Sequence, residues 1–142
     1  MNKKKKYSIK KKKKDEVIDI ISSCLQQYSE IFAAYIFGSF ISHQSFADID
    51  LGILTQSQPD NLLEYEMELE IKLYKQVKFE IDVRALNHAP LSFVQNAIRH
   101  GQLIFDSNPN RRADFENIVL KKYFDFSRFR RQYLEDVIDA PV

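Results

Sequence analysis

Two acidic residues stand inside an apolar stretch in the first half of the chain. Asp48 and Asp50 flank Ile49 and precede Leu51. Successive side chains of a β-strand point to opposite faces of the sheet, so both carboxylates are expected on the same face. Two neighbouring carboxylates on a partly buried strand repel each other and are costly to desolvate. A hard cation such as Mg²⁺, which prefers oxygen ligands, would remove that cost.

A Gly-Ser pair precedes these acids. Gly38 and Ser39 follow the apolar run 35–37, and eight residues separate Ser39 from Asp48. A turn of this kind can present backbone N–H groups to a phosphate. A phosphate-binding turn beside Mg²⁺-binding carboxylates predicts phosphoryl or nucleotidyl transfer.

A third carboxylate, Asp82, lies between two apolar residues in the segment 78–86. If this segment and residues 48–54 are strands of one sheet, the three carboxylates can converge. Two metal ions about 3.5–4 Å apart would then stabilise the attacking and leaving oxygens. Asp48 and Asp50 would hold both ions and a triphosphate, and Asp82 would hold the ion at the attacking hydroxyl and could accept its proton. The alternative is three exposed strand residues without a shared role.

Helices and strands alternate along the segments that must position these residues. Apolar spacing predicts helices over 15–28, 62–76 and 91–100, strands over 31–37, 48–54, 78–86 and 103–105, a helical turn over 39–45, and a long helix from Pro109 to about residue 139. This order predicts an α/β fold with one small mixed β-sheet flanked by helices. A helix joins strands 48–54 and 78–86, so we expect these strands to be parallel neighbours or near neighbours.

The basic residues are unevenly distributed. Residues 1–14 contain nine of the 21 Lys and Arg residues and no acid, which predicts a lysine-rich flexible tail. Residues 15–142 form the predicted domain and carry 12 basic against 20 acidic residues. Direct nucleic-acid binding is therefore not expected, except through the tail, which could also contact an acidic partner surface.

Length and composition indicate the class of protein and its cellular compartment. With 142 residues and 44% hydrophobic content, the chain is expected to be one globular domain. No apolar run approaches the roughly 20 residues of a membrane span, and the basic N-terminus lacks the apolar segment of a secretory signal. Cys24 is the single cysteine, so no intrachain disulfide can form. We expect a cytoplasmic protein without membrane contact.

The order of these motifs resembles that of the DNA polymerase β-type nucleotidyltransferase superfamily. The resemblance rests on Gly38-Ser39, on Asp48-Ile49-Asp50 in the next strand, and on Asp82 in a later one. Segments 82–90, 98–106 and 123–126 further resemble the minimal nucleotidyltransferases (MNT), the antitoxin halves of HEPN/MNT toxin–antitoxin pairs. The resemblance extends from about Tyr35 to the C-terminus, and it implies a polymerase β-like core with a long C-terminal helix.

The resemblance also implies an activity. The chain would be the antitoxin of a type VII-like system, an ATP-dependent protein adenylyltransferase that transfers AMP to a tyrosine hydroxyl of its partner, a HEPN ribonuclease toxin, and silences it. Carried over by position, Gly38 and Ser39 would bind the nucleotide phosphates. Asp48, Asp50 and Asp82 would be the catalytic and metal-binding carboxylates, with two Mg²⁺ ions.

Two other functions remain open. The short linker between Ser39 and Asp48 favours a non-catalytic antitoxin that neutralises its toxin by direct binding. The lysine tail favours a nucleotidyltransferase that acts on RNA or on a small molecule.

Overall fold

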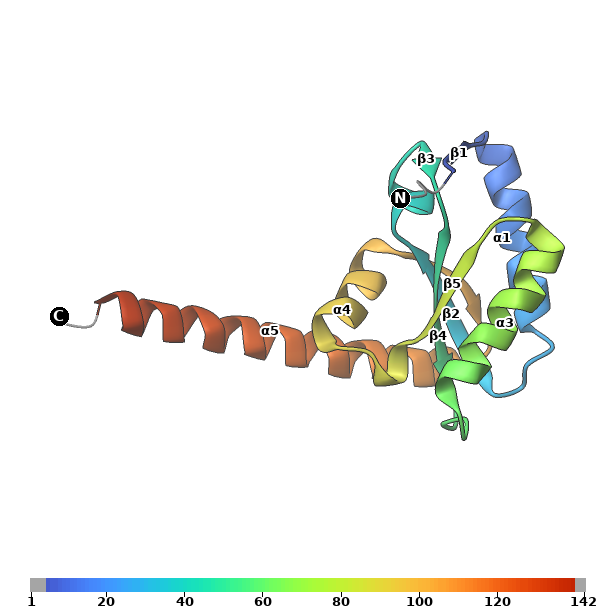
Figure 1. The fold of residues 1–142 in the computed structure, drawn as a ribbon. Coiled ribbons are helices and arrows are strands. Elements are labelled where there is room, and N and C mark those ends of the chain that lie inside the picture. Colours follow the sequence, from blue (N-terminus) through green and yellow to red (C-terminus); the bar gives the residue numbers. More distant parts are fainter. Residues whose placement is uncertain (1–4, 140–142) are drawn as a thin grey trace.

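A computed structural model describes residues 5–139 of the protein. The described part contains a four-stranded sheet between two layers of helices and a separate two-stranded sheet (Figure 1). The strands are β1 (Tyr7–Ser8), β2 (Ile31–Phe37), β3 (Ser45–Phe46), β4 (Ile49–Thr55), β5 (Ile81–Ala85) and β6 (Gln102–Asp106). The helices are α1 (Lys11–Leu25), α2 (Ser39–Ser42), α3 (Leu62–Val77), the 3₁₀ helix η1 (Leu86–His88), α4 (Leu91–His100) and α5 (Pro109–Asp139).

The four-stranded sheet has the order β5-β4-β2-β6 and is mixed. Strand β2 runs antiparallel to both β4 and β6, whereas β4 and β5 are parallel. All seven residues of β2 are buried, as expected for a central strand covered on both faces. The predicted α/β fold with a small mixed sheet is therefore confirmed, and β4 and β5 are the predicted parallel neighbours.

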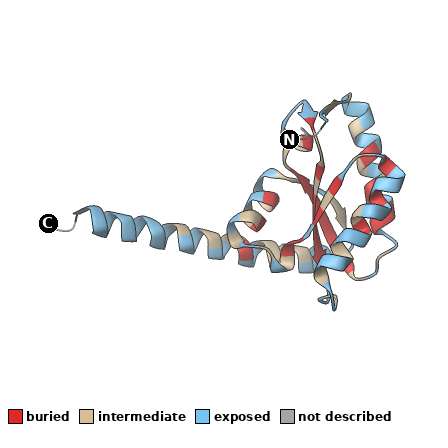
Figure 2. Cartoon of the chain, in the orientation of Figure 1, coloured by how far each residue is buried: buried red, intermediate tan, exposed pale blue. Residues whose placement is uncertain are grey.

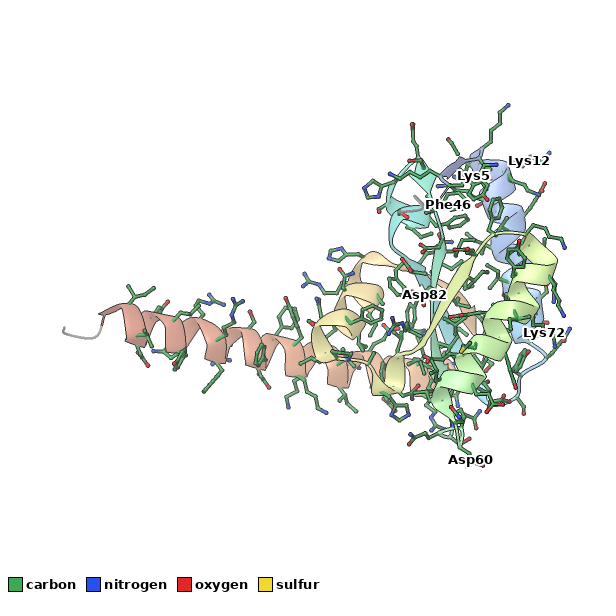
Figure 3. The ribbon with its side chains drawn as sticks, viewed as in Figure 1. Lys5, Lys12, Phe46, Asp60, Lys72 and Asp82 are labelled. Atoms are coloured by element: carbon green, nitrogen blue, oxygen red, sulfur yellow. The ribbon has the colours of Figure 1, made fainter. Side chains whose placement is uncertain are left out.

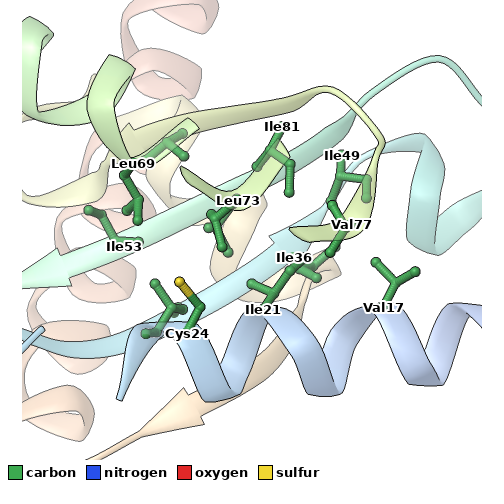
Figure 4. Packing of buried hydrophobic residues seen from close by; sticks show 14 of the residues in the cluster. Val17, Ile21, Cys24, Ile36, Ile49, Ile53, Leu69, Leu73, Val77 and Ile81 are labelled. Carbon is green, nitrogen blue, oxygen red and sulfur yellow. The ribbon is translucent and has the colours of Figure 1, made fainter. Parts of the chain in front are cut away.

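Two hydrophobic clusters cover the two faces of this sheet. On one face, α1 and α3 contribute Val17, Ile21, Leu69 and Leu73, which pack against sheet residues such as Ile36 (Figure 4). On the other face, the buried residues from the sheet, η1, α4 and α5 are Phe32, Ala33, Tyr35, Phe37, Leu54, Leu86, Val94, Ala97 and Val119. Buried residues concentrate along the strands and the inner sides of the helices (Figure 2).

The N-terminal lysine-rich segment differs from its prediction. Helix α1 begins at Lys11 rather than at Asp15, and Tyr7–Ser8 pair antiparallel with Ser45–Phe46. The ring of Tyr7 lies 6.0 Å from that of Phe46 and 5.0 Å from that of Phe79. These aromatic contacts favour a paired backbone despite the lysines. Residues 5–14 thus contain a strand and the first turn of a helix, and residues 1–4 of the predicted tail lie outside the described residues.

The long C-terminal helix is present as predicted. Helix α5 packs against the body near its start and then extends away from it (Figure 1). No helix in the described residues is long and apolar enough to cross a membrane.

A polar network ties the start of α5 to the sheet. The Tyr35 hydroxyl on β2 donates to Glu116 Oε1 at 2.7 Å. The Arg112 guanidinium donates to the same Glu116 oxygen at 2.9 Å and to Asp106 Oδ2 at 3.0 Å. Burial of Tyr35, together with its hydrogen bond to Glu116, raises the pKa of its hydroxyl well above the usual value, so it stays a donor. The network therefore connects α5, β2 and β6.

Replacing Arg112 by Met should lower the free energy of unfolding by about 2 kcal/mol, because Glu116 and Asp106 would lose their shared cation in a partly buried site. Urea denaturation followed by circular dichroism measures the change. Arg130→Met is the matched control, since Arg130 is exposed on the same helix. Equal stability of the two variants would contradict a structural role for the network.

Candidate functional site

Gly38 and Asp50 are in direct contact at one end of the sheet. Strands β2 and β4 place Phe37 opposite Asp50, so the chain leaves β2 directly beside this acid. Gly38 has a φ of +76°, a conformation that favours glycine. A Cβ at Gly38 would overlap the Asp50 carboxylate oxygen Oδ2. The absence of a side chain at Gly38 is therefore what lets the carboxylate lie against the turn.

Asp50 and Asp82 are neighbours across parallel strands. They are register partners in the pairing of β4 with β5, so their side chains leave the same face of the sheet. Both are partly exposed, and Figure 3 labels Asp82 on β5. Asp82 Oδ1 also lies 3.5 Å from Arg84 Nε, and both of these side chains are about half exposed. The sheet thus brings together the second and third acids that were predicted from the sequence.

Asp48 lies at the same end of the sheet, one residue before β4 begins. It lines a pocket of about 570 Å³ together with Asp82 and residues of α3. The other lining residues are Glu70, Ile71, Tyr74, Lys75, Glu80 and Ile81. The pocket is therefore acidic on the side of the strands and apolar at Ile71 and Tyr74.

The donor set at this end of the sheet fits a hard cation by its chemistry. Asp48, Asp50 and Asp82 offer only carboxylate oxygens, which Mg²⁺ prefers. Their side chains do not form a complete metal site as they stand. Within the described range, no group of three His, Cys, Asp or Glu residues is arranged to hold an ion. The assignment of the three acids as metal ligands stays a prediction.

Ser39 begins the one-turn helix α2 next to Gly38. Both residues are partly exposed at the same end of the sheet as the acids. The backbone N–H groups of Ile41 and Ser42 donate to the Gly38 carbonyl at 3.1 Å, so the turn closes on itself. The first backbone N–H groups of a helix have no partner within the helix, so the N–H group of Ser39 is suited to donate to an anion. Phosphate binding here is likewise still a prediction.

Two glutamates that sequence reasoning missed hold the strand of the third acid. Strand β5 lies at the edge of the sheet. On its outer side, the Val83 N–H donates to Glu70 Oε1 at 2.9 Å and the Ala85 N–H donates to Glu66 Oε2 at 2.8 Å. Side chains from α3 thus satisfy backbone groups that an edge strand otherwise leaves open. The spacing of four between Glu66 and Glu70 places both on one face of α3, which is the available sequence signal.

Comparison with known families assigns most of this region to one domain type. The profile described as "Polymerase beta, Nucleotidyltransferase" matches residues 19–110, which include Gly38, Ser39 and all three acids. A search of curated protein sequences found no match.

Several solved structures share the fold. A chain from a crystal structure of the toxin–antitoxin MntA–HepT matches with a TM-score of 0.64 and 19% identity, covering 91% of this chain and 99% of that one. A chain from the tri-AMPylated Shewanella oneidensis HEPN toxin in complex with MNT antitoxin matches with a TM-score of 0.64 and 19% identity, covering 92% and 99%. A chain from a toxin–antitoxin structure with AMP-PNP reaches a TM-score of 0.69 at 21% identity, covering 85% and 98%. At these identities the likeness establishes the fold.

Replacing Gly38 by Ala should destabilise the protein by about 1–3 kcal/mol, because the positive φ strains any L-residue and the new methyl group overlaps Asp50. Thermal and urea unfolding measure the loss. In an Asp50→Ala background the same change should cost less, since only the backbone strain remains. An equal cost in both backgrounds would contradict the contact between Gly38 and the carboxylate.

Proposed function

Because this chain belongs to the polymerase beta nucleotidyltransferase family, we propose that it is an ATP-dependent protein adenylyltransferase and the antitoxin of a HEPN ribonuclease toxin. The observation that carries the proposal is the position of Asp50, which lies between the Gly38 turn and Asp82. Nucleotidyl transfer needs a triphosphate, a metal and an acceptor hydroxyl within bonding distance of one another. At this end of the sheet, the Gly38 turn is the candidate for the triphosphate and the three acids are the candidates for the metal, while the acceptor hydroxyl would come from the partner.

In this mechanism the turn and the acids have separate roles. The backbone at Gly38 and Ser39 binds the phosphates of ATP. Asp48, Asp50 and Asp82 would hold Mg²⁺, which neutralises charge on the triphosphate when bound. A tyrosine oxygen of the partner attacks the α-phosphorus, the bond from that phosphorus to the bridging oxygen of the β-phosphate breaks, and pyrophosphate leaves. Asp82 accepts the hydroxyl proton.

The solved relatives support the nature of the partner. One contains a tri-AMPylated HEPN toxin bound to an MNT antitoxin, and another contains AMP-PNP. The matched chains are covered almost completely by this one. A toxin of the same class in the cytoplasm is thus the proposed target, with a tyrosine as the acceptor.

The far part of α5 offers a surface for that partner. Phe126, Phe129, Tyr133 and Val137 are exposed by 57, 69, 60 and 55%. Their spacing of three and four places them on one side of the helix. An exposed apolar stripe of this kind on a helix that extends from the body is typical of a protein interface (Figure 1).

The two alternative functions differ from this proposal in their products. A non-catalytic antitoxin would bind the toxin through α5 and leave its mass unchanged. A nucleotidyltransferase that acts on RNA or on a small molecule would leave the toxin mass unchanged and label its own acceptor instead. Intact-mass spectrometry of the co-expressed toxin separates the proposed adenylyltransferase from both alternatives, because only the adenylyltransferase adds the mass of AMP to the toxin.

Replacing Asp48 and Asp50 together by Asn should reduce AMP transfer at least about 100-fold, because neutral amides cannot hold the metal or compensate for the lost charge. Intact-mass spectrometry of the purified toxin after incubation with ATP and Mg²⁺ measures the transfer, and EDTA should stop it in the wild type. Asp60→Asn is the matched control, since Asp60 lies in the loop before α3, away from Asp82 (Figure 3). Wild-type rates in the double variant would refute the mechanism.

Replacing Phe129 and Tyr133 together by Ala should weaken the toxin complex by about 2–4 kcal/mol, because both rings are exposed in the free chain and available for burial. Isothermal titration calorimetry with the toxin measures the affinity. Glu135→Ala on the same helix is the control. Glu135→Ala should bind like the wild type. If the double variant also binds like the wild type, this stripe is not the interface.

A further inference from the structure

Lys14 lies where two segments far apart in the sequence meet. It belongs to the first turn of α1, within the lysine-rich segment, and is half-buried, whereas Lys11, Lys12 and Lys13 are exposed. The Lys14 ammonium group donates to the backbone carbonyl of Phe40 at 2.7 Å and to that of His43 at 3.0 Å. Both carbonyls belong to α2 and its C-cap, directly after the Gly38-Ser39 turn.

Helix α2 depends on contacts from outside itself. It has four residues. A single turn is only marginally stable by itself, because the entropy lost in fixing its backbone outweighs the few hydrogen bonds that it forms. The last carbonyls of a helix have no partner within it. The Lys14 ammonium group satisfies two carbonyls at this end with charge-assisted hydrogen bonds, which are stronger than neutral ones.

Aromatic rings hold the same ammonium group from a second side. Lys14 Nζ lies 5.1 Å from the centre of the Phe40 ring and 5.6 Å from that of Phe46. These rings are both buried and contact each other edge to face at 4.8 Å. A cation within about 6 Å of an aromatic ring is attracted to its face. Lys14 therefore contacts the start and the end of the linker between the turn and β4.

The N-terminal strand holds the rest of that linker. Ser8 pairs with Ser45 and Tyr7 with Phe46. Together β1 and Lys14 restrain α2 and β3, which account for most of the eight residues between Ser39 and Asp48. A shift of α2 would move Gly38 and Ser39 relative to Asp50, because Gly38 is packed against this carboxylate.

We propose that Lys14 is a positioning residue that holds the Gly38-Ser39 turn in place for the nucleotide phosphates. The proposal rests on the proposed transfer reaction. Lys14 acts through the backbone of residues 40–43 and takes no part in the chemical step. The lysine-rich segment thus contributes one structural lysine to the candidate site, and three exposed neighbours serve as internal comparisons.

The test compares Lys14→Met, Lys14→Arg and Lys12→Met in the full chain with its toxin. Met keeps the apolar stem and removes the charge and the donors, whereas Arg keeps both. Lys12 is exposed on the same helix (Figure 3). Lys14→Met should raise the KM for ATP about tenfold, because the loss of one charge-assisted hydrogen bond corresponds to a change of about this size in a binding constant. The kcat should change about twofold or less. Lys14→Arg should recover most of the loss, and Lys12→Met should match the wild type.

Amide hydrogen exchange supplies a readout that does not need activity. In Lys14→Met, exchange should be faster across residues 38–46 and unchanged in the core strand β2, with wild-type exchange in Lys12→Met. A wild-type KM in Lys14→Met, or a rise in KM without faster exchange in residues 38–46, overturns the proposal. If the wild type itself transfers no AMP, the proposed function fails, and the exchange data alone then decide whether Lys14 holds the turn.

Discussion

The contact between the Gly38 turn and the Asp50 carboxylate is the constraint on which the candidate site depends. It exists because β2 and β4 are antiparallel neighbours with Phe37 opposite Asp50. The chain must therefore turn directly beside the acid, and only a residue without a side chain fits that space. In the proposed reaction the turn would bind phosphate and the acid would hold metal, and the two have to be close because the metal must reach the same phosphates.

The surroundings of this contact restrain it from several directions. Asp82 is held on an edge strand, where Glu70 and Glu66 accept hydrogen bonds from the N–H groups of Val83 and Ala85. Lys14 contacts the linker that follows the turn. Beneath them, the apolar layers on both faces of the sheet fix the positions of β2 and β4. The partly exposed acids thus lie on or next to strands whose other residues are largely buried, which suits a site that must orient several charged groups.

The molecule divides into a body that carries the acids and a helix that extends from it. The network around Arg112 and Glu116 joins the two by linking α5 to β2 and β6. Beyond that network, exposed aromatic residues continue along α5 with no cover from the described part of the chain. This arrangement suits the proposed transfer to another protein, because α5 would be available to bind the partner while the pocket near Asp82 would receive its hydroxyl.

The sequence by itself located the four strands of the main sheet and the longer helices in order. It also singled out the three acids, whose role stays a prediction. Periodicity located β2, α3, α4 and α5 closely, because a helix or a strand is specified by residues that are near neighbours in the sequence. The tertiary structure decided everything that joins distant segments. Sequence alone could not pair Tyr7 with Phe46, because the hydrophobic gain comes from rings that meet only in the fold. Nor could it distinguish Lys14 from its neighbours, since the five consecutive lysines 10–14 are chemically alike and only burial against Phe40 sets Lys14 apart.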